Sequence, residues 1–342
     1  TTAGERIGII GAVTPQLPFI SSPRNVVVSS DIAGIVQVEI DRMTARGIDK
    51  IIFISHLQDV DEDVALAAEL SGVDIMIAGG GDETLANPDD LLVPGDAIFG
   101  PYPVLATNAD GATVPVVTTA GDYKYLGRLD VQFDDYGNVV TWDGGPIRIA
   151  GGDNPDAVAS NSVLQRMVVE PVTAFLAALE SNVIATSEVA LEGRRDPGIR
   201  TEETNLGNLM ADSILYAANL NAADFGMPEA DVALQNGGGI RNNTLIPAGD
   251  ITELNTFEIA PFSNFVSIVP DIPREQFKQI LENAYSSAPD ANGRFAQIAG
   301  MTVEYDPNRT SMDIDGETGE ILVEGTKVVN VTLADGTVIV DG

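Results

Sequence analysis

The sequence contains one histidine, His56, and places it directly after a short apolar strand. The segment Ile51–Gln58 reads IIFISHLQ, so Ser55 and His56 come at the carboxyl end of that strand. Sites in open α/β sheets form at this end of the strands, and a neutral imidazole is a good ligand for a transition metal. His56 is therefore either a metal ligand or a hydrogen-bonded structural histidine. With one histidine, the chain cannot build a site that needs several imidazoles.

Three glycines and two carboxylates follow a second apolar strand. The segment Ile75–Leu85 reads IMIAGGGDETL, with Gly79–Gly81 before Asp82 and Glu83. Glycines let a backbone approach a ligand closely, and carboxylates at a strand end can bind a hard cation. The alternative is an ordinary turn that leads into a polar loop. The pattern of a phosphate-binding P-loop is absent, because no Lys-Ser or Lys-Thr follows the glycines.

Basic residues are few, so their grouping is informative. Arg194, Arg195 and Arg200 lie close together in a chain with 18 lysines and arginines, and Arg241 closes the segment Asn236–Arg241, NGGGIR. Guanidinium groups bind phosphate or carboxylate through two parallel hydrogen bonds. These arginines either bind an anion or neutralise neighbouring acidic side chains.

The segment Pro261–Asn264, PFSN, places an aromatic ring near an amide. Phe262 could stack on a planar base while Asn264 hydrogen-bonds the edge of that base. The alternative is that Phe262 belongs to an ordinary core.

The elements that must position these residues alternate in the first 150 residues. Apolar stretches predict strands at 6–13, 50–55, 73–78, 114–119, 126–133 and 138–142. Helical spacing predicts helices over 30–46 and 61–70, and a Pro-, Gly- and Asp-rich loop covers 87–103. The order favours a layered α/β domain with a largely parallel core.

A polar seam at 151–161 and an amphipathic helix over 162–179 lead into a second unit. There the sequence predicts helices over 204–220 and 274–285 and strands at 189–191, 232–235, 251–253, 266–270, 295–305 and 327–340. We therefore expect an α/β (α+β) protein with a domain over 1–150, a linker and helix over 151–186, and a mixed α/β domain over 187–342.

The composition excludes several partners and chemistries. Lys+Arg 18 against Asp+Glu 51 gives a net charge of −33, and this field repels phosphate, so we expect neither nucleic acid nor an anionic membrane as a general partner. The acidity suits a salty medium or serves solubility. Cys is 0, which excludes disulfides and thiol chemistry. No signal peptide is visible, and no apolar run approaches the ~20 residues of a membrane span.

Together, these segments resemble the 5′-nucleotidase family over nearly the whole chain. Its C-terminal domain is matched at Thr204–Asp212 (TNLGNLMAD), NGGGIR, PFSN and Gly293–Met301 (GRFAQIAGM). Its metallophosphoesterase domain is matched at Gly4–Pro15 (GERIGIIGAVTP), IIFISHLQ and Asp122–Val139 (DYKYLGRLDVQFDDYGNV). The resemblance implies a partial metallophosphoesterase-type α/β domain joined by a helix to a 5′-nucleotidase C-terminal domain.

The resemblance implies a phosphomonoesterase that hydrolyses nucleotide phosphate esters, located outside the cell or in the periplasm. In the family, two divalent metals activate water for attack on the ester. His56 matches a metal ligand. Asp82 or Glu83 would replace two family histidines as oxygen ligands, so Zn, Mn, Mg and Ca all stay open.

The resemblance also assigns substrate residues in the C-terminal domain, which recognises the nucleotide in this family. Three guanidinium groups match residues that contact phosphate or ribose, a glycine-rich loop begins the substrate site, and an aromatic matches one of two rings that sandwich the base. The matched residues are Arg195, Arg200, Arg241, Asn236, Gly238, Phe262 and its polar neighbour Asn264.

Two metal motifs of the family, Asp-x-His and Asn-His-Glu/Asp, have no counterpart, and the second supplies the catalytic histidine. The second aromatic has none either. We therefore expect the catalytic residues upstream of Thr1, and we expect the missing N-terminal part to come from the same protein or from another chain. The alternatives are a module that binds nucleotide or anion without cleaving it and an acidic extracellular structural protein.

Overall fold

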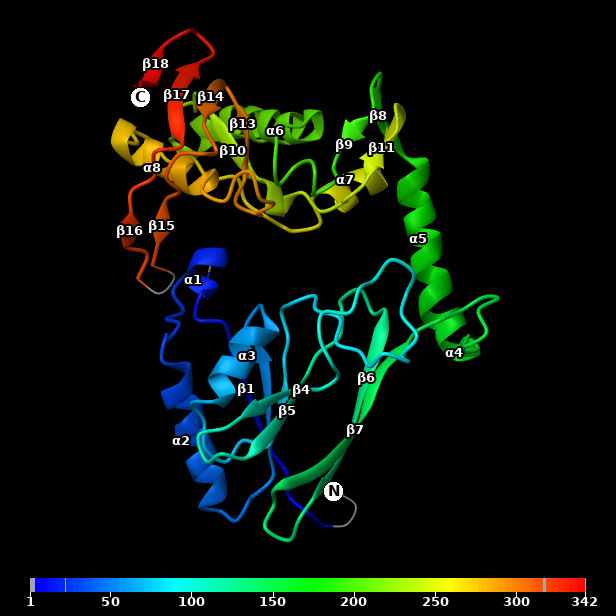
Figure 1. Ribbon diagram of the computed structural model, residues 1–342. Coiled ribbons are helices and arrows are strands. Elements are labelled where there is room, and N and C mark those ends of the chain that lie inside the picture. The colour runs from blue at the N-terminus through cyan, green and yellow to red at the C-terminus, as the bar shows by residue number, and fades with distance from the viewer. Residues whose placement is uncertain (1–3, 22, 316–317, 342) are drawn as a thin grey trace. The chain divides into compact units, whose positions relative to one another are not determined.

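A computed structural model, which describes residues 4–21, 23–315 and 318–341, divides the chain into two units, Thr1–Ser160 and Asn161–Gly342 (Figure 1). Both units combine helices with strands, so the predicted α/β class is confirmed. The boundary between the two units, after Ser160, lies within the predicted linker and helix over 151–186.

The first unit is built around a five-stranded sheet in the order β1-β2-β3-β5-β4. Strands β1, β2, β3 and β5 are parallel, β4 is antiparallel to β5, and β6 and β7 form a separate hairpin. The elements are β1 (Gly8–Val13), α1 (Leu17–Ile20), α2 (Ile32–Thr44), β2 (Ile51–His56), α3 (Val60–Ala67), β3 (Ile75–Ile77), β4 (Val104–Thr107), β5 (Thr113–Val117), β6 (Tyr125–Phe133) and β7 (Val139–Arg148). The expected parallel core is present, whereas β4 was not predicted.

The two faces of this sheet differ in burial. Helices α2 and α3 cover one face, where Ile40 and Leu66 pack into a core with Phe53. Side chains alternate between faces along a strand. On the opposite face, Ile9, Ile54 and Ile77 are 61%, 42% and 41% exposed. We call these three residues the open sheet face.

The second unit begins with one continuous helix, formed by α4 (Ser162–Leu164), a π-helical turn (Gln165–Val169) and α5 (Glu170–Ser181). It continues with β8 (Val183–Ser187), β9 (Leu191–Glu192), α6 (Asn205–Asn221), β10 (Ala233–Asn236), β11 (Leu245–Ile246), β12 (Gly249–Thr252), α7 (Glu253–Ile259), α8 (Arg274–Ala284), β13 (Ala296–Ala299), β14 (Met301–Tyr305), β15 (Asp313–Ile314), β16 (Ile321–Val323), β17 (Val328–Leu333) and β18 (Val338–Asp341). Strand β10 pairs with β13, and α6 packs on both. Strands β14, β17 and β18 form a separate antiparallel sheet.

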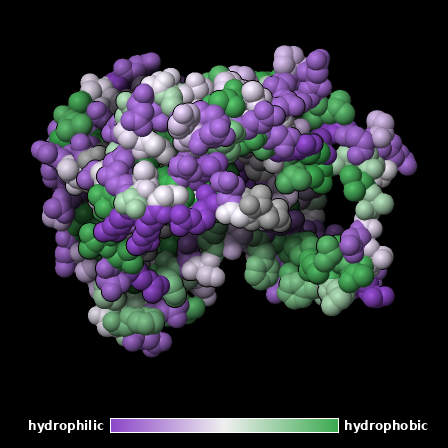
Figure 2. Space-filling view, turned by 90° about the horizontal axis from the view of Figure 1, so that it is seen from below, coloured by the Kyte–Doolittle hydropathy of each residue, from purple (hydrophilic) through white to green (hydrophobic). Residues whose placement is uncertain are grey.

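The helix Ser162–Ser181 is long and apolar enough to cross a membrane, by length and composition alone, and it is not buried. The sequence prediction missed this helix because it counted only uninterrupted apolar runs. Polar residues such as Arg166 and Glu170 interrupt the apolar residues of this helix. Apolar residues reach the surface elsewhere as well. Figure 2 shows groups of hydrophobic residues between hydrophilic ones on the face that it displays.

Some predicted strands are wrong or displaced. Residues 266–270 form no strand, since this exposed segment has no pairing partner among the described residues and ends in Pro270, which cannot donate a backbone hydrogen bond. The predicted strand over 251–253 ends at Thr252, which begins α7 through a reciprocal capping box with Asn255. Of the predicted strand over 189–191, only Leu191 belongs to a strand, β9. The predicted strand over 295–305 is divided into β13 and β14 at Gly300, whose φ is +76°.

Candidate functional site

Three arginines of the second unit come together. Arg195 and Arg200 lie in the loop between β9 and α6, where the Arg200 N–H donates to the Arg195 carbonyl at 3.2 Å, and Arg241 lies shortly after β10. Burial lowers the pKa of Arg200, and the positive charges of Arg195 and Arg241 lower it further. We call Arg195, Arg200 and Arg241 the arginine cluster.

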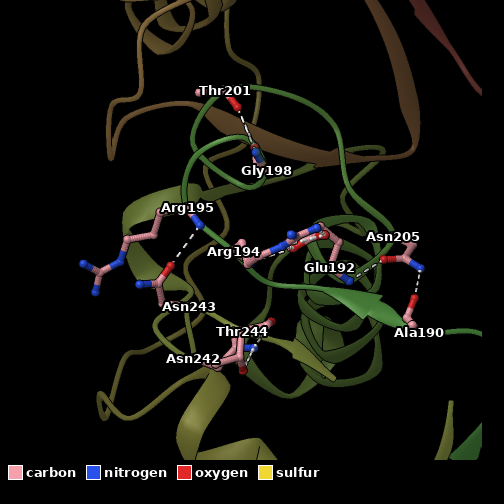
Figure 3. A network of polar contacts seen from close by, with 10 residues as sticks. All are labelled: Ala190, Glu192, Arg194, Arg195, Gly198, Thr201, Asn205, Asn242, Asn243 and Thr244. Carbon is pink, nitrogen blue, oxygen red and sulfur yellow. Dashed lines mark hydrogen bonds and ion pairs between the residues drawn. The ribbon is translucent and has the colours of Figure 1, made fainter. Parts of the chain in front are cut away.

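The arginine cluster is not neutralised by acidic neighbours. Within the described part of the chain, none of its three guanidinium groups forms an ion pair with a carboxylate, and the Nε atoms of Arg195 and Arg200 are buried without an acceptor. Arg194 differs, because its Nε donates to Glu192 Oε1 at 2.9 Å. Figure 3 shows Arg194 folded onto Glu192 while the Arg195 side chain points away from Arg194 and Glu192. The charge-pairing alternative from the sequence therefore applies to Arg194, whereas the three arginines of the cluster form no ion pair with a carboxylate among the described residues.

The loop that carries Arg200 is held by Gln297, a side chain on β13 that is 1% exposed. Its Nε2 donates to the Ile199 carbonyl at 3.1 Å and to the Glu202 carbonyl at 2.8 Å, and its Oε1 accepts from Thr204 N at 3.2 Å. Sequence reasoning assigned no role to Gln297. Its only signal is a polar residue inside an otherwise apolar strand.

A glycine turn over 237–239 packs against the same loop. A side chain at Gly237 would place its Cβ 2.1 Å from the Ile199 carbonyl oxygen, so only glycine fits this approach. The Gly238 N–H donates to the Gly293 carbonyl at 2.8 Å, and Arg241 Nη1 donates to the Gly238 carbonyl at 3.1 Å. The turn thereby fixes Arg241 beside the rest of the cluster.

An exposed aromatic ring borders the cluster. The guanidinium carbon of Arg241 lies 5.5 Å from the centre of the Phe262 ring, a cation–π distance, and Phe262 remains 54% exposed. Asn264 follows with its N–H on the Phe262 carbonyl at 2.8 Å, and Asn236 is exposed at the start of the glycine turn. An oxyanion beside a planar group is the ligand that this chemistry suits.

In the first unit, the turn over 79–83 packs against the end of β2. A Cβ at Gly80 would lie 2.6 Å from His56 Nδ1, which places the imidazole directly against this turn. The Asp82 carboxylate lies close to Gly121, and the Glu83 carboxylate folds over Gly81. Among the described residues, no three histidine, aspartate or glutamate side chains gather as metal ligands. His56, Asp82 and Glu83 therefore do not by themselves fit a metal centre.

A buried carboxyl next to this turn was missed by sequence reasoning. Asp63, in the first turns of α3, is 0% exposed. Burial raises its pKa to about 6; the Ser55 hydroxyl opposes this rise, and the charges of Glu62, Glu83 and Asp59 add to it. The sequence offered no signal, since Asp61, Glu62 and Asp63 look alike as acidic residues at a helix start.

Comparisons with known proteins agree on one family. Residues 183–341 match the family model described as 5′-nucleotidase, C-terminal domain. The snake venom 5′-nucleotidase of Macrovipera lebetinus is 30% identical over 313 residues, which cover 89% of this chain and 72% of the relative. The 5′-nucleotidase of Mus musculus is 30% identical over 317 residues, covering 90% of this chain and 52% of the relative. The chain thus spans about half the length of several curated relatives.

A solved structure supports the same likeness. The crystal structure of the 5′-nucleotidase precursor from Thermus thermophilus superimposes with a TM-score of 0.69 and 31% identity. The match covers 97% of this chain and 60% of the Thermus chain.

Proposed function

Because the chain belongs to the 5′-nucleotidase family, we propose that its arginine cluster binds the phosphate of a nucleotide and that the protein takes part in hydrolysing that phosphate ester. The observation that carries the proposal is the group formed by Arg195, Arg200 and Arg241 with no carboxylate bound to it among the described residues. Neighbouring guanidinium groups without counter-charges repel one another, so an anion between them is favoured.

Only some arginines, such as Arg42, Arg148 and Arg194, pair with a carboxylate among the described residues, so an unpaired arginine is not unusual by itself. What favours an external anion is that three unpaired guanidinium groups lie together, because their like charges repel one another. In a chain of net charge −33, the attraction must be local, since the long-range field opposes the approach of phosphate.

The nucleoside part of the ligand is assigned to the neighbouring aromatic and glycine turn. Phe262 offers an exposed ring face of the kind that stacks on a base. Asn236 and Asn264 offer amide groups for hydrogen bonds to ribose or base, and Gly238 allows close approach of the backbone. These roles remain part of the proposal.

Hydrolysis is the second half of the proposal. The family resemblance implies divalent metals that activate water, with His56, Asp82 and Glu83 as the residues of this chain that would contribute ligands. Because these three do not gather as a ligand set, a module that binds nucleotide without cleaving it is the competing function. The named venom relative supports a location outside the cytoplasm as part of the same proposal.

The test measures AMP binding and phosphate release on the same preparation, with Mn²⁺, Ca²⁺ or Zn²⁺ added. We expect Arg200→Gln and Arg241→Gln to weaken AMP binding about tenfold or more, because each removes a charge-assisted hydrogen bond to phosphate. Arg194→Gln is the matched control: it removes the same charge, but its guanidinium is already bound to Glu192.

The outcomes separate the candidates. Phosphate release with any of the metals supports the enzyme, and AMP binding without release supports the binding module. Absence of AMP binding, or equal losses in Arg194→Gln and Arg200→Gln, would overturn the proposal.

A further inference from the structure

Two Asn-Gly pairs occur in the sequence, Asn236–Gly237 and Asn292–Gly293. In such a pair the glycine nitrogen can attack the side-chain carbonyl carbon of the asparagine, because glycine has no side chain to obstruct the approach. The Gly237 N–H is engaged, since it donates to the Phe295 carbonyl at 2.7 Å. The Gly293 N–H has no acceptor among the described residues, and both residues of this second pair are partly exposed to water. Of the two pairs, the second therefore has the free nitrogen.

The side-chain carbonyl of Asn292 is held by its neighbour Arg294. Its Oδ1 accepts hydrogen bonds from Arg294 N at 3.0 Å and from Arg294 Nε at 3.3 Å. When a nucleophile attacks the adjoining Cγ, negative charge develops on this oxygen, and donors already aimed at it lower the barrier. The Oδ1 of Asn236 accepts instead from a neutral amide, Gln235 Nε2, at 3.1 Å. The Asn292 side chain is therefore the better electrophile, and it stands next to the free nitrogen.

The backbone of Asn292 and Gly293 contacts two segments of the candidate site. The Asn292 N–H donates to the Arg200 carbonyl at 3.2 Å, and the Gly293 carbonyl accepts from the Gly238 N–H at 2.8 Å. The Gly238 carbonyl accepts in turn from Arg241 Nη1 at 3.1 Å. A longer main chain between the Asn292 nitrogen and the Gly293 oxygen could not keep both contacts. Such a change would displace Arg200 relative to Arg241.

We propose that Asn292 is a site of spontaneous deamidation and that its conversion to isoaspartate weakens the binding of phosphate by the arginine cluster. A bond forms between Gly293 N and Asn292 Cγ, the bond from Cγ to Nδ2 breaks, and ammonia leaves with the proton of the glycine nitrogen. Water then opens the succinimide. Hydrolysis at Cγ yields aspartate, and hydrolysis at the main-chain carbonyl yields isoaspartate.

Both products carry a new negative charge, and isoaspartate also inserts one methylene group into the main chain. The effect on binding rests on the proposed function, in which the arginine cluster holds the phosphate of a nucleotide. The modification itself does not depend on that function.

The first test compares fresh protein with protein incubated in mildly alkaline buffer, because base removes the proton of the glycine nitrogen. Tryptic peptides are separated and weighed by mass spectrometry, since deamidation replaces NH2 by OH and isoaspartate elutes apart from aspartate. We expect Asn292 to convert in the folded protein while Asn236 stays intact. In urea we expect both to convert at similar rates, because the hydrogen bond that engages Gly237 is lost.

The second test measures AMP binding on the same samples. We expect the isoaspartate fraction to bind AMP about tenfold more weakly than fresh protein, the size of one lost charge-assisted hydrogen bond. Asn292→Asp adds the charge without lengthening the main chain and should lose less affinity than the isoaspartate form. Gly293→Ala is the matched control for incubation: its Cβ would lie 3.4 Å from Gly238 Cα, an ordinary contact, but it obstructs ring closure. Its affinity should be the same before and after incubation.

The proposal is overturned if Asn292 stays intact in the incubated protein, or if Asn236 converts equally fast in the folded state. It is also overturned if the isoaspartate fraction binds AMP as tightly as fresh protein, or no more weakly than Asn292→Asp. Absence of AMP binding in fresh protein would refute the proposed function instead, and the peptide masses would still decide whether Asn292 is the modified residue.

Discussion

At the scale of residues, the arginines of the candidate site could be predicted from the sequence, whereas the buried polar residues could not. The arginines stood out because basic residues are few in so acidic a chain, which made their grouping informative. What the sequence could not tell was that Arg194 is bound to Glu192 while its neighbour Arg195 is not. That difference depends on backbone direction at two adjacent residues, which no composition or spacing encodes. Gln297 and Asp63 were missed because their importance lies in burial, and burial is a property of the fold.

Gln297 gives a prediction at this scale. Replacing it by leucine would leave Thr204 N and the carbonyls of Ile199 and Glu202 without partners in a buried place. We expect Gln297→Leu to lower the free energy of unfolding by about 2–4 kcal/mol and to weaken AMP binding through the loosened Arg200 loop. Urea denaturation followed by circular dichroism, with AMP titration at low temperature, measures both.

The control for Gln297 is an exposed amide of the same unit, Gln276→Leu on α8. It should leave both quantities close to the wild-type values. Unchanged stability in Gln297→Leu would contradict the bridging role of that side chain.

At the scale of elements, strands and helices with strong patterns were predicted correctly, and those set by pairing were not. The strands β1, β2 and β3 and the helices α2 and α6 follow from runs of apolar residues at the expected periods. Residues 266–270 have the composition of a strand but pair with no strand in the described part of the chain, and strand formation requires a partner. The helix α7 depends on the reciprocal cap of Thr252 and Asn255, a signal that was present in the sequence but was overlooked.

The carboxyl group of Asp74, between β2 and β3 in the chain, leads to a prediction of how stability depends on pH. Asp74, just before β3, accepts a hydrogen bond from Ile51 N at 2.7 Å, and burial is the largest cause that raises its pKa from 3.8 to about 7. The folded state therefore holds this proton more tightly than the unfolded chain. The resulting stability is complete below about pH 4 and is lost as the pH rises through about 7.

We expect Asp74→Asn, which keeps an acceptor for Ile51, to gain stability relative to wild type by about 2–4 kcal/mol between pH 4 and pH 8. The only tryptophan, Trp142 on β7, reports unfolding of the first unit by fluorescence. A stability difference that stays constant over this pH range would refute the assignment. Asp61→Asn, at an exposed position, serves as the comparison.

At the scale of the whole molecule, the net charge of −33 dominates behaviour in solution. Mutual repulsion of carboxylates opposes the folded state, and dissolved ions screen it over about 10 Å at 0.1 M salt. This charge follows directly from the composition, whereas only the fold shows that the guanidinium groups of the arginine cluster form no ion pair among the described residues.

Thermal unfolding in KCl tests the effect. We expect the melting temperature to rise by roughly 5 °C between 50 and 500 mM KCl, with most of the gain at the lower end because screening saturates. Sucrose at matched osmolality separates ionic screening from solute exclusion. A melting temperature that falls or stays flat in KCl would show that repulsion is not what limits stability.

The open sheet face gives this screening a second consequence. Ile9, Ile54 and Ile77 present an apolar surface, and repulsion between the like charges of two copies opposes its association with the same surface of another copy. Added salt screens the repulsion within each copy, which stabilises the fold, and it also screens the repulsion between copies, which favours association. We therefore expect the ionic strength that gives the highest melting temperature to lie close to the one at which light scattering first detects association. The protein is therefore expected to stay both folded and unassociated only within a limited range of ionic strength, with unfolding favoured below this range and association of copies above it.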